Sequence, residues 1–416
     1  MSELFSPTRP TISELSNDTF RKARNADRRL LFGAIAIAFL TFLLPGRWPV
    51  LSSPNFAVSK ALAGSSDPFF AKEDIAIGDA RVPMLHSAAI TELSDDRLLA
   101  AWYGGTKEAV SDVQIYASFS DTSKRNWSAP FSLMTPERAG AGLGRLVLVL
   151  GNPVLFTDHN GQIWLFFGSI AGGGWSTTDV NFIRSSDNGA TWSPARRIVA
   201  APFTHSGTLV KGAAFEYDDG TIGLPIYRSY DAHSFSALLR LDGDGRVIAM
   251  SDMSHDVRGG LQPTVAVTGG KEAVSFQRFY GPQPRRVLRT MTTDAGGTWQ
   301  TPVKTDLPNP DSAVAPLVLS DGRLMLVYNN SEERRDNLTI AISADQGITW
   351  KNIYLLEYTL PSDPPTTEFS YPQVTRDKTG TIHVVYTVDR NRIRHAAFNE
   401  AWIEYAIRVP TLRRIL

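Results

Sequence analysis

An eight-residue pattern, S/T-x-D-x-G-x-T-W, occurs three times in this chain, at Ser185–Trp192, Thr292–Trp299 and Ser343–Trp350. Each copy lies between runs of alternating apolar residues, as expected for a turn that joins two antiparallel strands. In such a turn the Asp carboxylate can accept hydrogen bonds from nearby amides, the Gly can adopt positive φ, and the Trp can fold back as an apolar plug. The pattern therefore predicts repeated units of antiparallel sheet.

The spacing of these copies indicates a repeat of about fifty residues. Asp294 and Asp345 are 51 residues apart, whereas Asp187 and Asp294 are 107 apart, so the longer interval holds about two repeats. One repeat has therefore lost its pattern, and Leu239–Val247 lies where it is expected. A further degenerate copy spans Ser118–Trp127. Such a period, with several short strands in each repeat, is typical of a β-propeller.

The expected fold class is all-β, a six-bladed β-propeller. The count of six includes two segments without the pattern, Pro153–Phe167 and Tyr371–Phe398. The patterned turns are expected on the rim, away from the chemistry, so they identify a fold and leave the function open.

Composition excludes several classes of protein and site. The 42 basic and 42 acidic residues balance, so the charge gives no reason to expect a nucleic-acid partner. The absence of cysteine excludes a disulfide framework and a thiol nucleophile. The seven histidines are scattered, and His383 and His395 fall in strand-like segments, so we expect neither a metal site nor a cofactor.

The N-terminal region differs from the rest of the chain. Leu30–Leu44 is uncharged and apolar, and Trp48–Leu51 can extend it through the membrane interface to the ~20 residues that a bilayer requires. Positive charge precedes this stretch, at Arg21, Lys22, Arg24, Arg28 and Arg29. The pattern predicts an N-terminal transmembrane helix with its basic flank in the cytoplasm.

A cleaved signal peptide is the alternative, with Ala61–Ala63 as a cleavage site, but that site lies far beyond the apolar stretch. We therefore expect an uncleaved anchor in a bacterial inner membrane, with the propeller facing the periplasm or the outside. The expected organisation is a cytoplasmic tail at 1–29, an anchor at 30–51, a flexible linker at 52–66, the propeller at 67–400 and a C-terminal tail at 401–416.

The repeated pattern is the Asp-box, and on this basis the chain resembles the sialidase (neuraminidase) superfamily with its BNR repeats. The resemblance implies a site for a sugar whose anomeric carbon carries a carboxylate. In the family, three arginines hold that carboxylate, because guanidinium groups bind it bidentately and stay charged. A tyrosine is the nucleophile, a glutamate takes its proton, and an aspartate serves as acid and base.

The resemblance identifies Tyr371 as the candidate nucleophile, because Glu368–Val374 looks like the family's Tyr-Ser segment in the last blade. The alternative is a strand tyrosine packed in the core. A tyrosine without assistance has a pKa near 10, so the reaction needs a group that lowers it or takes its proton.

Two arginines match the family's carboxylate ligands. Arg335 resembles the third arginine of an Arg-x-Asn-Leu run and fits better than Arg334, with a solvated loop charge as the alternative. Arg278 ends a strand before the second Asp-box and resembles the second arginine. It is preferred to Arg285 and Arg286, which lie in a proline-rich loop.

The first arginine is where the sequence departs from the family. Arg81 stands in an Arg-Val-Pro run that matches literally, but it lies 17 residues before Leu98, whereas the family interval leads to His86. We prefer His86, because the alternation of the strand must be kept. The same counting places Lys107 at another basic position of the family pattern.

The candidate acid/base is Asp112, which precedes the expected strand Val113–Tyr116 and so lies at the end of a loop. Glu108 is the rival acid, and a simple turn aspartate is the alternative role for Asp112.

A second departure is Gln262, which stands where the family has the glutamate that accepts the proton of the tyrosine. Glutamine can orient a phenol but cannot take its proton. Glu368 is a possible substitute. It lies three residues before Tyr371, however, so in a regular strand the two side chains would point to opposite faces. Either a loop brings Glu368 round or the arginines alone activate the tyrosine.

These departures make the chain similar to the predicted-neuraminidase branch of bacterial sialidase-like propellers, and Asn152 and Trp175 are further candidates for substrate binding there. Four segments carry that similarity, at 86–88, 102–106, 151–153 and 172–175. The expected function is a membrane-anchored exo-glycosidase that removes terminal 2-keto sugar acids such as sialic acid from glycoconjugates. The alternatives are a 3-deoxy-octulosonic acid (Kdo) hydrolase acting on lipopolysaccharide precursors and a non-catalytic carbohydrate-binding propeller.

Overall fold

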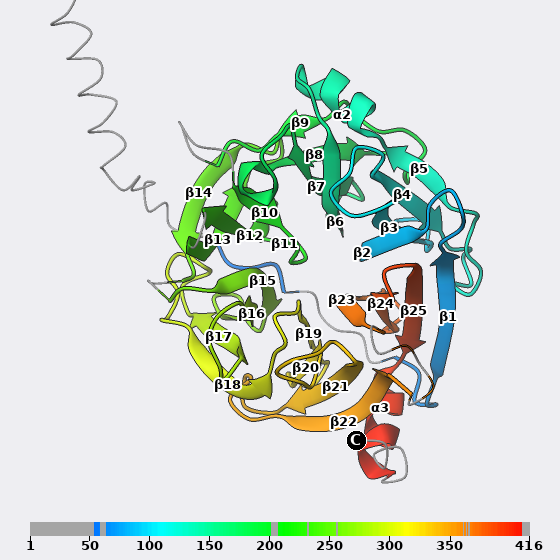
Figure 1. Cartoon of the computed structure of the whole chain (residues 1–416). Coiled ribbons are helices and arrows are strands. Elements are labelled where there is room, and N and C mark those ends of the chain that lie inside the picture. Colours follow the sequence, from blue (N-terminus) through cyan, green and yellow to red (C-terminus); the bar gives the residue numbers. More distant parts are fainter. Residues whose placement is uncertain are drawn as a thin grey trace, which may run out of the picture. The chain divides into compact units, whose positions relative to one another are not determined.

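The computed structural model describes residues 54–58, 64–200, 207–230, 233–254, 257–360, 362, 364 and 367–409. Within them the chain forms six antiparallel sheets around a central axis (Figure 1), which confirms the predicted six-bladed β-propeller. The predicted membrane segment at 30–51 lies outside the described residues. None of the helices in the described part is long and apolar enough to cross a membrane.

Five blades follow one another along the chain, and each begins with its innermost strand. The first blade consists of β2 (Met84–Glu92), β3 (Leu98–Gly105), β4 (Gln114–Phe119) and β5 (Phe131–Met134), and the second of β6 (Val149–Thr157), β7 (Ile163–Ile170), β8 (Asp179–Ser185) and β9 (Arg196–Arg197). The third blade consists of β10 (Thr208–Val210), β11 (Phe215–Glu216), β12 (Ile222–Tyr230), β13 (His233–Leu241) and β14 (Val247–Asp252). The fourth blade consists of β15 (Gly260–Val267), β16 (Ala273–Phe279), β17 (Arg286–Thr292) and β18 (Val303–Pro308), and the fifth of β19 (Ala315–Val318), β20 (Leu324–Tyr328), β21 (Asn337–Ser343) and β22 (Lys351–Tyr358). Two short helices interrupt this order, α2 (Pro136–Leu143) before the second blade and the 3-10 turn η1 (Trp175–Thr177) within it.

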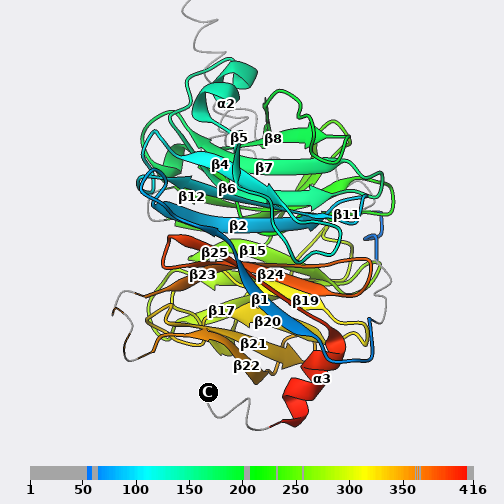
Figure 2. The same ribbon diagram turned by 90° about the vertical axis from the view of Figure 1, so that its right-hand side faces the viewer.

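The sixth blade closes the ring with strands from both ends of the described chain. It combines β23 (Phe369–Arg376), β24 (Ile382–Val388) and β25 (Arg392–Phe398) with β1 (Phe70–Ile77), which forms its outer edge. In the side view β1 runs beside β25 (Figure 2), and the register extends from Phe70 opposite Phe398 to Ile77 opposite Arg392. Pairing of distant segments in one sheet leaves no blade open and stabilises the closed ring.

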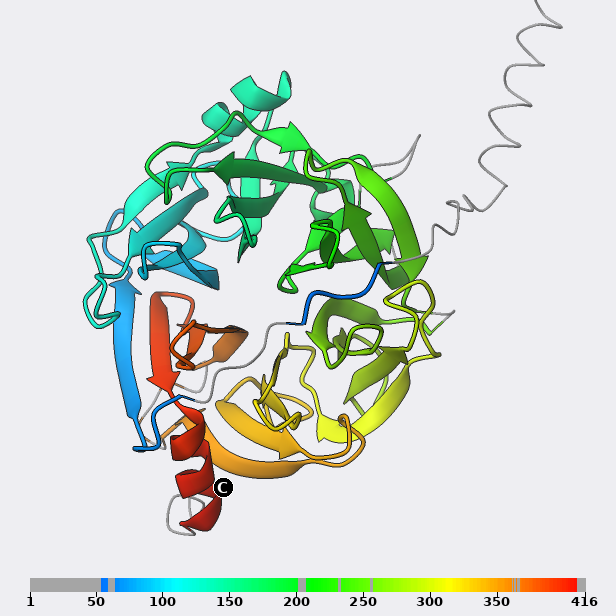
Figure 3. The same cartoon turned by 180° about the vertical axis from the view of Figure 1, so that it is seen from behind.

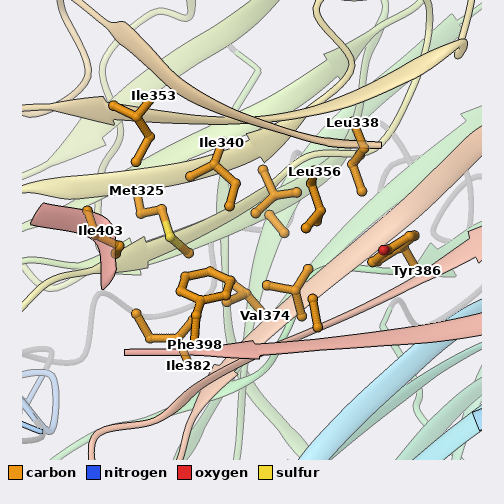
Figure 4. Close-up of a cluster of buried hydrophobic side chains, with 14 of the residues drawn as sticks. Met325, Leu338, Ile340, Ile353, Leu356, Val374, Ile382, Tyr386, Phe398 and Ile403 are labelled. Atoms are coloured by element: carbon orange, nitrogen blue, oxygen red, sulfur yellow. The ribbon is translucent and has the colours of Figure 1, made fainter. Parts of the chain in front are cut away.

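The core consists of separate clusters, most of them between neighbouring blades. Figure 4 shows the one between the fifth and sixth blades, where Ile340 and Met325 face Val374 and Phe398. These side chains alternate along their strands with residues of the opposite face, so each strand contributes to two layers. Ile403 of α3 (Glu400–Arg408) covers the same cluster.

Two predicted boundaries need correction. The region 401–416 was expected as a tail, but α3 packs its apolar face on the sixth blade. The linker at 52–66 was expected to be flexible, yet Phe56 is 2% exposed and packs edge to face on Phe215 and at a tilt on Tyr217, at centroid distances of 5.4 and 5.2 Å. From behind, this blue segment lies against the third and fourth blades (Figure 3). Burial of the Phe56 ring against two other aromatic rings holds residues 54–58 on the propeller, although their polar neighbours suggested a loop.

The Asp-box turns have the predicted internal geometry. The Asp187 carboxylate accepts hydrogen bonds from Thr191 N at 2.9 Å, Thr191 Oγ1 at 2.6 Å and Ser185 Oγ at 2.8 Å. Gly189 has a φ of 84°, and Trp192 donates its indole N–H to the carbonyl of Gly189 at 3.1 Å. The carboxylates of Asp294 and Asp345 accept the equivalent bonds.

The glycine of an Asp-box also joins its blade to the preceding one. A Cβ atom on Gly189 would lie 2.8 Å from the ring of Phe119 in the first blade. In the fifth blade, Gly347 packs in the same way on Phe276, and Trp350 meets that ring at 5.4 Å between centroids. The boxes therefore stabilise the contact between blades, consistent with a structural role.

Both degenerate repeats lie at the predicted places. Leu239–Val247 contains the turn between β13 and β14, and Ser118–Trp127 contains the turn between β4 and β5. Asp242 and Asp121 accept backbone N–H groups there at 2.8 and 3.2 Å, as the box aspartates do. Pro153–Phe167, however, belongs to β6 and β7 of the second blade, because the inner strands of a blade precede its own box.

Candidate active site

Successive turns of an antiparallel sheet lie at alternate ends of the sheet. The Asp-box turn of each blade joins the third and fourth strands, so the turn between the second and third strands lies at the opposite end of the propeller. The connections from one blade to the next share that opposite end. The predicted site residues lie on these segments or on the innermost strands, except Arg278, which lies near the end of β16 opposite Leu261 of β15. We call this end the site end.

The innermost strands of four blades carry a β-bulge at the same position. In β2, β6, β15 and β23 one residue is added relative to the neighbouring strand, and the residue at the bulge has positive φ. These residues are Ser87 (56°), Asn152 (47°), Gln262 (50°) and Tyr371 (54°). Non-glycine residues rarely adopt this conformation, and bulges of this kind redirect a side chain next to a functional site.

Two more residues complete a ring of six around the axis. Lys211 follows Val210, the last paired residue of β10, just as each bulge residue follows a paired one. Asp311, with a φ of 56°, precedes β19. We call the resulting set the axial ring: Ser87, Asn152, Lys211, Gln262, Asp311 and Tyr371.

Tyr371 lies among basic groups. Its hydroxyl accepts a hydrogen bond from Nη1 of Arg278 at 3.2 Å. The guanidinium carbon of Arg335 and Nζ of Lys211 each lie 5.7 Å from the centroid of its ring. The ring of His86 meets it edge to face at 4.7 Å between centroids.

Three arginines converge on the site end, and each contacts a carboxylate or a carbonyl. Arg278 forms an ion pair with Asp311, and Arg335 donates Nη2 to the backbone carbonyl of Asp311 at 2.7 Å. Arg335 Nη1 also lies 4.0 Å from Glu368 Oε2. Arg390, in the turn between β24 and β25, donates Nε to Glu368 Oε1 at 2.7 Å.

The charge of Arg278 is secured by its partners. Burial by itself would lower the pKa of the guanidinium, but Tyr371 and Asp311 outweigh it, and the net pKa is raised. A buried arginine that stays charged and holds the hydroxyl of Tyr371 can stabilise negative charge on that oxygen.

His86 is fully buried, and neither of its ring nitrogens has a hydrogen-bond partner among the described residues. Burial, reinforced by Arg390, Arg335, Lys211 and Arg278, holds the pKa of the imidazole well below its usual range. The side chain is therefore neutral, so it supplies no charge for a substrate carboxylate. The third cation at this end is Arg390, while Arg81 is exposed in the turn that precedes β2.

Gln262 and Asn152 form the polar floor beside Tyr371. Gln262 Oε1 accepts from Arg278 Nη1 at 3.2 Å, the same nitrogen that binds Tyr371. Asn152 Oδ1 accepts from the hydroxyl of Ser87 at 3.4 Å. Both amides also help to counter the effect of burial on Tyr227, whose pKa is raised chiefly by that burial. Gln262 thus orients the cluster but can accept no proton from it.

Glu368 does not lie in a regular strand with Tyr371, because the bulge after Ser370 intervenes and Glu368 precedes β23. Its carboxylate bridges Arg390 and Arg335 instead. Regular strand alternation therefore does not relate Glu368 to Tyr371, and the carboxylate pairs with the arginines and not with the phenol.

The loop between β3 and β4 carries the candidate acids. Glu108 accepts a hydrogen bond from the hydroxyl of Tyr103 at 3.0 Å and forms an ion pair with Arg390, so it belongs to the cluster. Asp112 is exposed and accepts the backbone N–H of Thr106 at 3.1 Å, which closes the loop on itself. Lys107 is exposed on the same loop.

Trp175 forms one wall of the site end. A Cβ on Gly151, the residue before Asn152, would lie 3.3 Å from its ring, and the indole packs beside Val149 and Ile170. The lack of a side chain at Gly151 therefore lets an aromatic surface approach the axial ring. Within the described ranges, no group of three or more His, Cys, Asp or Glu residues has the arrangement of a metal site.

Residues 96–384 match the family described as the BNR repeat-like domain. The chain belongs to this family. No curated protein sequence matched it at a significant level.

Several solved structures similar to this BNR propeller are sialidases. A Hadza microbial sialidase matches with a TM-score of 0.64 at 17% identity, over 78% of this chain and 68% of that one. The leech intramolecular trans-sialidase has a TM-score of 0.64 at 13% identity, over 80% and 71%. The Ruminococcus gnavus intramolecular trans-sialidase has a TM-score of 0.62 at 15% identity, over 82% and 99%. At these identities the likeness shows a shared fold, that of a sialidase-like BNR propeller.

The sequence predictions for this BNR propeller missed three residues of the cluster, Lys211, Tyr227 and Arg390. A signal for the axial ring was present, because three ring residues are followed by proline, at Asn152–Pro153, Gln262–Pro263 and Tyr371–Pro372. Aligning the blades on these dipeptides would have directed attention to Lys211 in the third blade. Arg390 lies in a tight turn of the sixth blade with a φ of 53°, and only the topology places that turn at the site end.

Proposed function

We propose that this BNR propeller is an exo-glycosidase that hydrolyses terminal 2-keto sugar acids, such as sialic acid, from glycoconjugates. The observation that carries the proposal is the position of Tyr371, which lies on a bulge at the axis with its hydroxyl bound by Arg278. The side chain of Tyr371 lies beside three basic side chains, Arg278, Arg335 and Lys211, and its backbone has a positive φ. This arrangement is unusual for a purely structural residue.

The arginines have the capacity to hold a substrate carboxylate. A guanidinium group carries five N–H donors. Among the described residues, Arg278 and Arg390 each use Nε and Nη1 in hydrogen bonds. Arg335 uses Nη2 in its hydrogen bond to the carbonyl of Asp311. Donors therefore remain on all three side chains toward the site end, and they suit the planar geometry of a carboxylate.

The reaction proposed for this geometry is a double displacement at the anomeric carbon. The phenol oxygen of Tyr371 attacks that carbon while an acid of the 106–112 loop, Glu108 or Asp112, protonates the departing oxygen. Water then releases the sugar from the tyrosine. Arg278 stabilises the charge on the phenol oxygen at both steps.

A non-catalytic carbohydrate-binding propeller is the second candidate, favoured by Gln262, which cannot take the proton of Tyr371. The proposed cellular setting is an inner-membrane anchor at 30–51 that holds the propeller outside the cytoplasm.

Release of free sugar acid from aryl glycosides of N-acetylneuraminic acid and of Kdo by the purified propeller tests the proposal. Hydrolysis of either glycoside by the wild type, with loss in Tyr371→Phe, supports it and identifies the sugar. The matched control is Tyr405→Phe, whose phenol is exposed on α3 outside the cluster. Binding of the sugar acid without release would favour the binding propeller, and neither binding nor release would refute both.

A further inference from the structure

Lys211 occupies the axial-ring position of the third blade and is 2% exposed. Its Nζ lies 5.7 Å from the ring centroid of Tyr371, and its hydrogen bond, to the backbone carbonyl of Ala88, is long at 3.5 Å. Among the described residues it forms no ion pair. A lysine buried without a carboxylate is uncommon and expensive when charged.

The carboxylates of the site are already committed elsewhere. Asp311 pairs with Arg278, and Glu368 and Glu108 pair with Arg390. Burial lowers the pKa of Lys211 to about 7. A large part of the population therefore carries a neutral amine near neutral pH, and a neutral amine has a lone pair that can accept a proton.

The groups that face Lys211 come from several blades. His86 on β2 is neutral, while Arg278 on β16, Arg335 before β21 and Arg390 after β24 are cationic. None of them gives the amine a negative partner, and burial is what lowers the pKa of Lys211. His86 is a weak rival as a base, because its pKa is held well below neutrality. A base is most effective when its pKa is close to the working pH, which favours Lys211.

A cavity of about 30 Å³ is lined by Lys211, Thr264, Pro372 and Gln373 among others. This volume suffices for one or two water molecules. Neither polar atom of the buried Gln373 amide has a hydrogen-bond partner among the described residues, and water in this cavity would satisfy it. Lys211 therefore borders a space that can hold water.

We propose that Lys211 accepts the proton of the Tyr371 hydroxyl, in place of the carboxylate that Gln262 cannot supply. This inference rests on the proposed function.

In the first step the O–H bond of Tyr371 breaks and an N–H bond forms at Nζ of Lys211, with one water relaying the proton. The phenolate attacks the anomeric carbon, and the electrons of the glycosidic bond leave with the aglycone oxygen, which takes a proton from Glu108 or Asp112. In the second step water donates one proton to that acid's carboxylate as it adds to the anomeric carbon. The released phenolate recovers its proton from the ammonium of Lys211.

The test compares four proteins: the wild type, Lys211→Met, Lys211→Met combined with Gln262→Glu, and Lys351→Met. Lys351 is an exposed lysine of β22 and serves as the matched control. The measurements are kcat, KM and the pH profile of kcat/KM on the aryl glycoside that the wild type hydrolyses.

For the wild type we expect kcat/KM to rise with pH through an apparent pKa near 7, because Lys211 must be neutral to accept a proton. Lys211→Met should lose about 10²- to 10⁴-fold in kcat with little change in KM, and this rising limb should disappear. The double variant should recover at least roughly tenfold, with a rising limb at lower pH, since a carboxylate now takes the proton.

A Lys211→Met protein with the kcat and pH profile of the wild type would overturn the inference and leave the proposed function standing. A wild type inactive on both glycosides would overturn the proposed function and this inference with it. If Lys211→Met does not fold, Lys211→Gln, which retains a hydrogen-bonding group for Ala88, takes its place with the same expected loss.

Discussion

Substituting methionine for Lys211 should stabilise the propeller at neutral pH, because the native fold keeps this amine away from water and without a counter-ion. Methionine retains an unbranched apolar stem of similar length, so the packing around β10 changes little. The variant removes the ionisable group and leaves the rest of the axial ring in place. Its effect on stability therefore reports the cost of burying the amine.

The magnitude follows from the change in pKa between the unfolded and folded states. Burial lowers the pKa of Lys211 from 10.5 to about 7. Above pH 10.5 the amine is neutral in both states and carries no penalty. As the pH falls toward 7, only the unfolded state gains the proton, so the wild type loses stability. At 1.36 kcal/mol per pH unit, this loss is on the order of 4 kcal/mol at pH 7.

Urea unfolding followed by tryptophan fluorescence at several pH values between 7 and 10.5 measures this difference. We expect the difference in unfolding free energy between Lys211→Met and the wild type to depend on pH. This difference should favour the variant by several kcal/mol more at pH 7 than at pH 10.5. Lys351→Met should parallel the wild type. Parallel curves for Lys211→Met and the wild type would show that Lys211 is charged in the fold, which refutes the reasoning.

Three further predictions concern other parts of the chain. Arg335→Lys should weaken binding of an acidic sugar by about tenfold or more in calorimetry, since lysine lacks the bidentate fork, while Arg334→Lys, at an exposed neighbour, should not; equal affinity would remove Arg335 from the site. Asp345→Ala should lower the unfolding free energy by about 1–2 kcal/mol without changing kcat. Because the hydrogen bonds with Thr349 lower the pKa of Asp345 to about 2, this difference in unfolding free energy should shrink as the pH falls from about 4 toward 2. An unchanged unfolding curve would contradict the structural role of the box. Reporter fusions after Asp67 should be active outside the cytoplasm, and cytoplasmic activity would reject the anchor.

The fold was predictable because its signal is local and repeated. The Asp-box places an aspartate, a glycine and a tryptophan in one turn, and the positions of Asp187, Asp294 and Asp345 give the period directly. The docking of Phe56 and of α3 was not predictable in this way. Both depend on contacts with blades distant in the sequence, and neither segment shows a strong pattern of its own.

The candidate site was predictable where a residue type and its neighbours resemble the family. Arg278, Arg335 and Tyr371 do come together at the axis. Lys211 was not found from the sequence, because its importance arises from burial at the axis and it lacks the proline that follows three other residues of the axial ring. Arg390 was missed because the search for a third cation followed the first blade, whereas the turn of the sixth blade supplies it.

The assignment of Tyr371 as nucleophile is the central claim, and covalent trapping tests it most directly. A 3-fluoro sugar-acid fluoride forms an intermediate that hydrolyses slowly, so incubation with the purified propeller followed by intact-mass and peptide mass spectrometry locates any adduct. We predict one adduct per chain, on Tyr371, with none in Tyr371→Phe and an unchanged yield in Tyr405→Phe. An adduct on another residue, or full activity of Tyr371→Phe, would contradict the account.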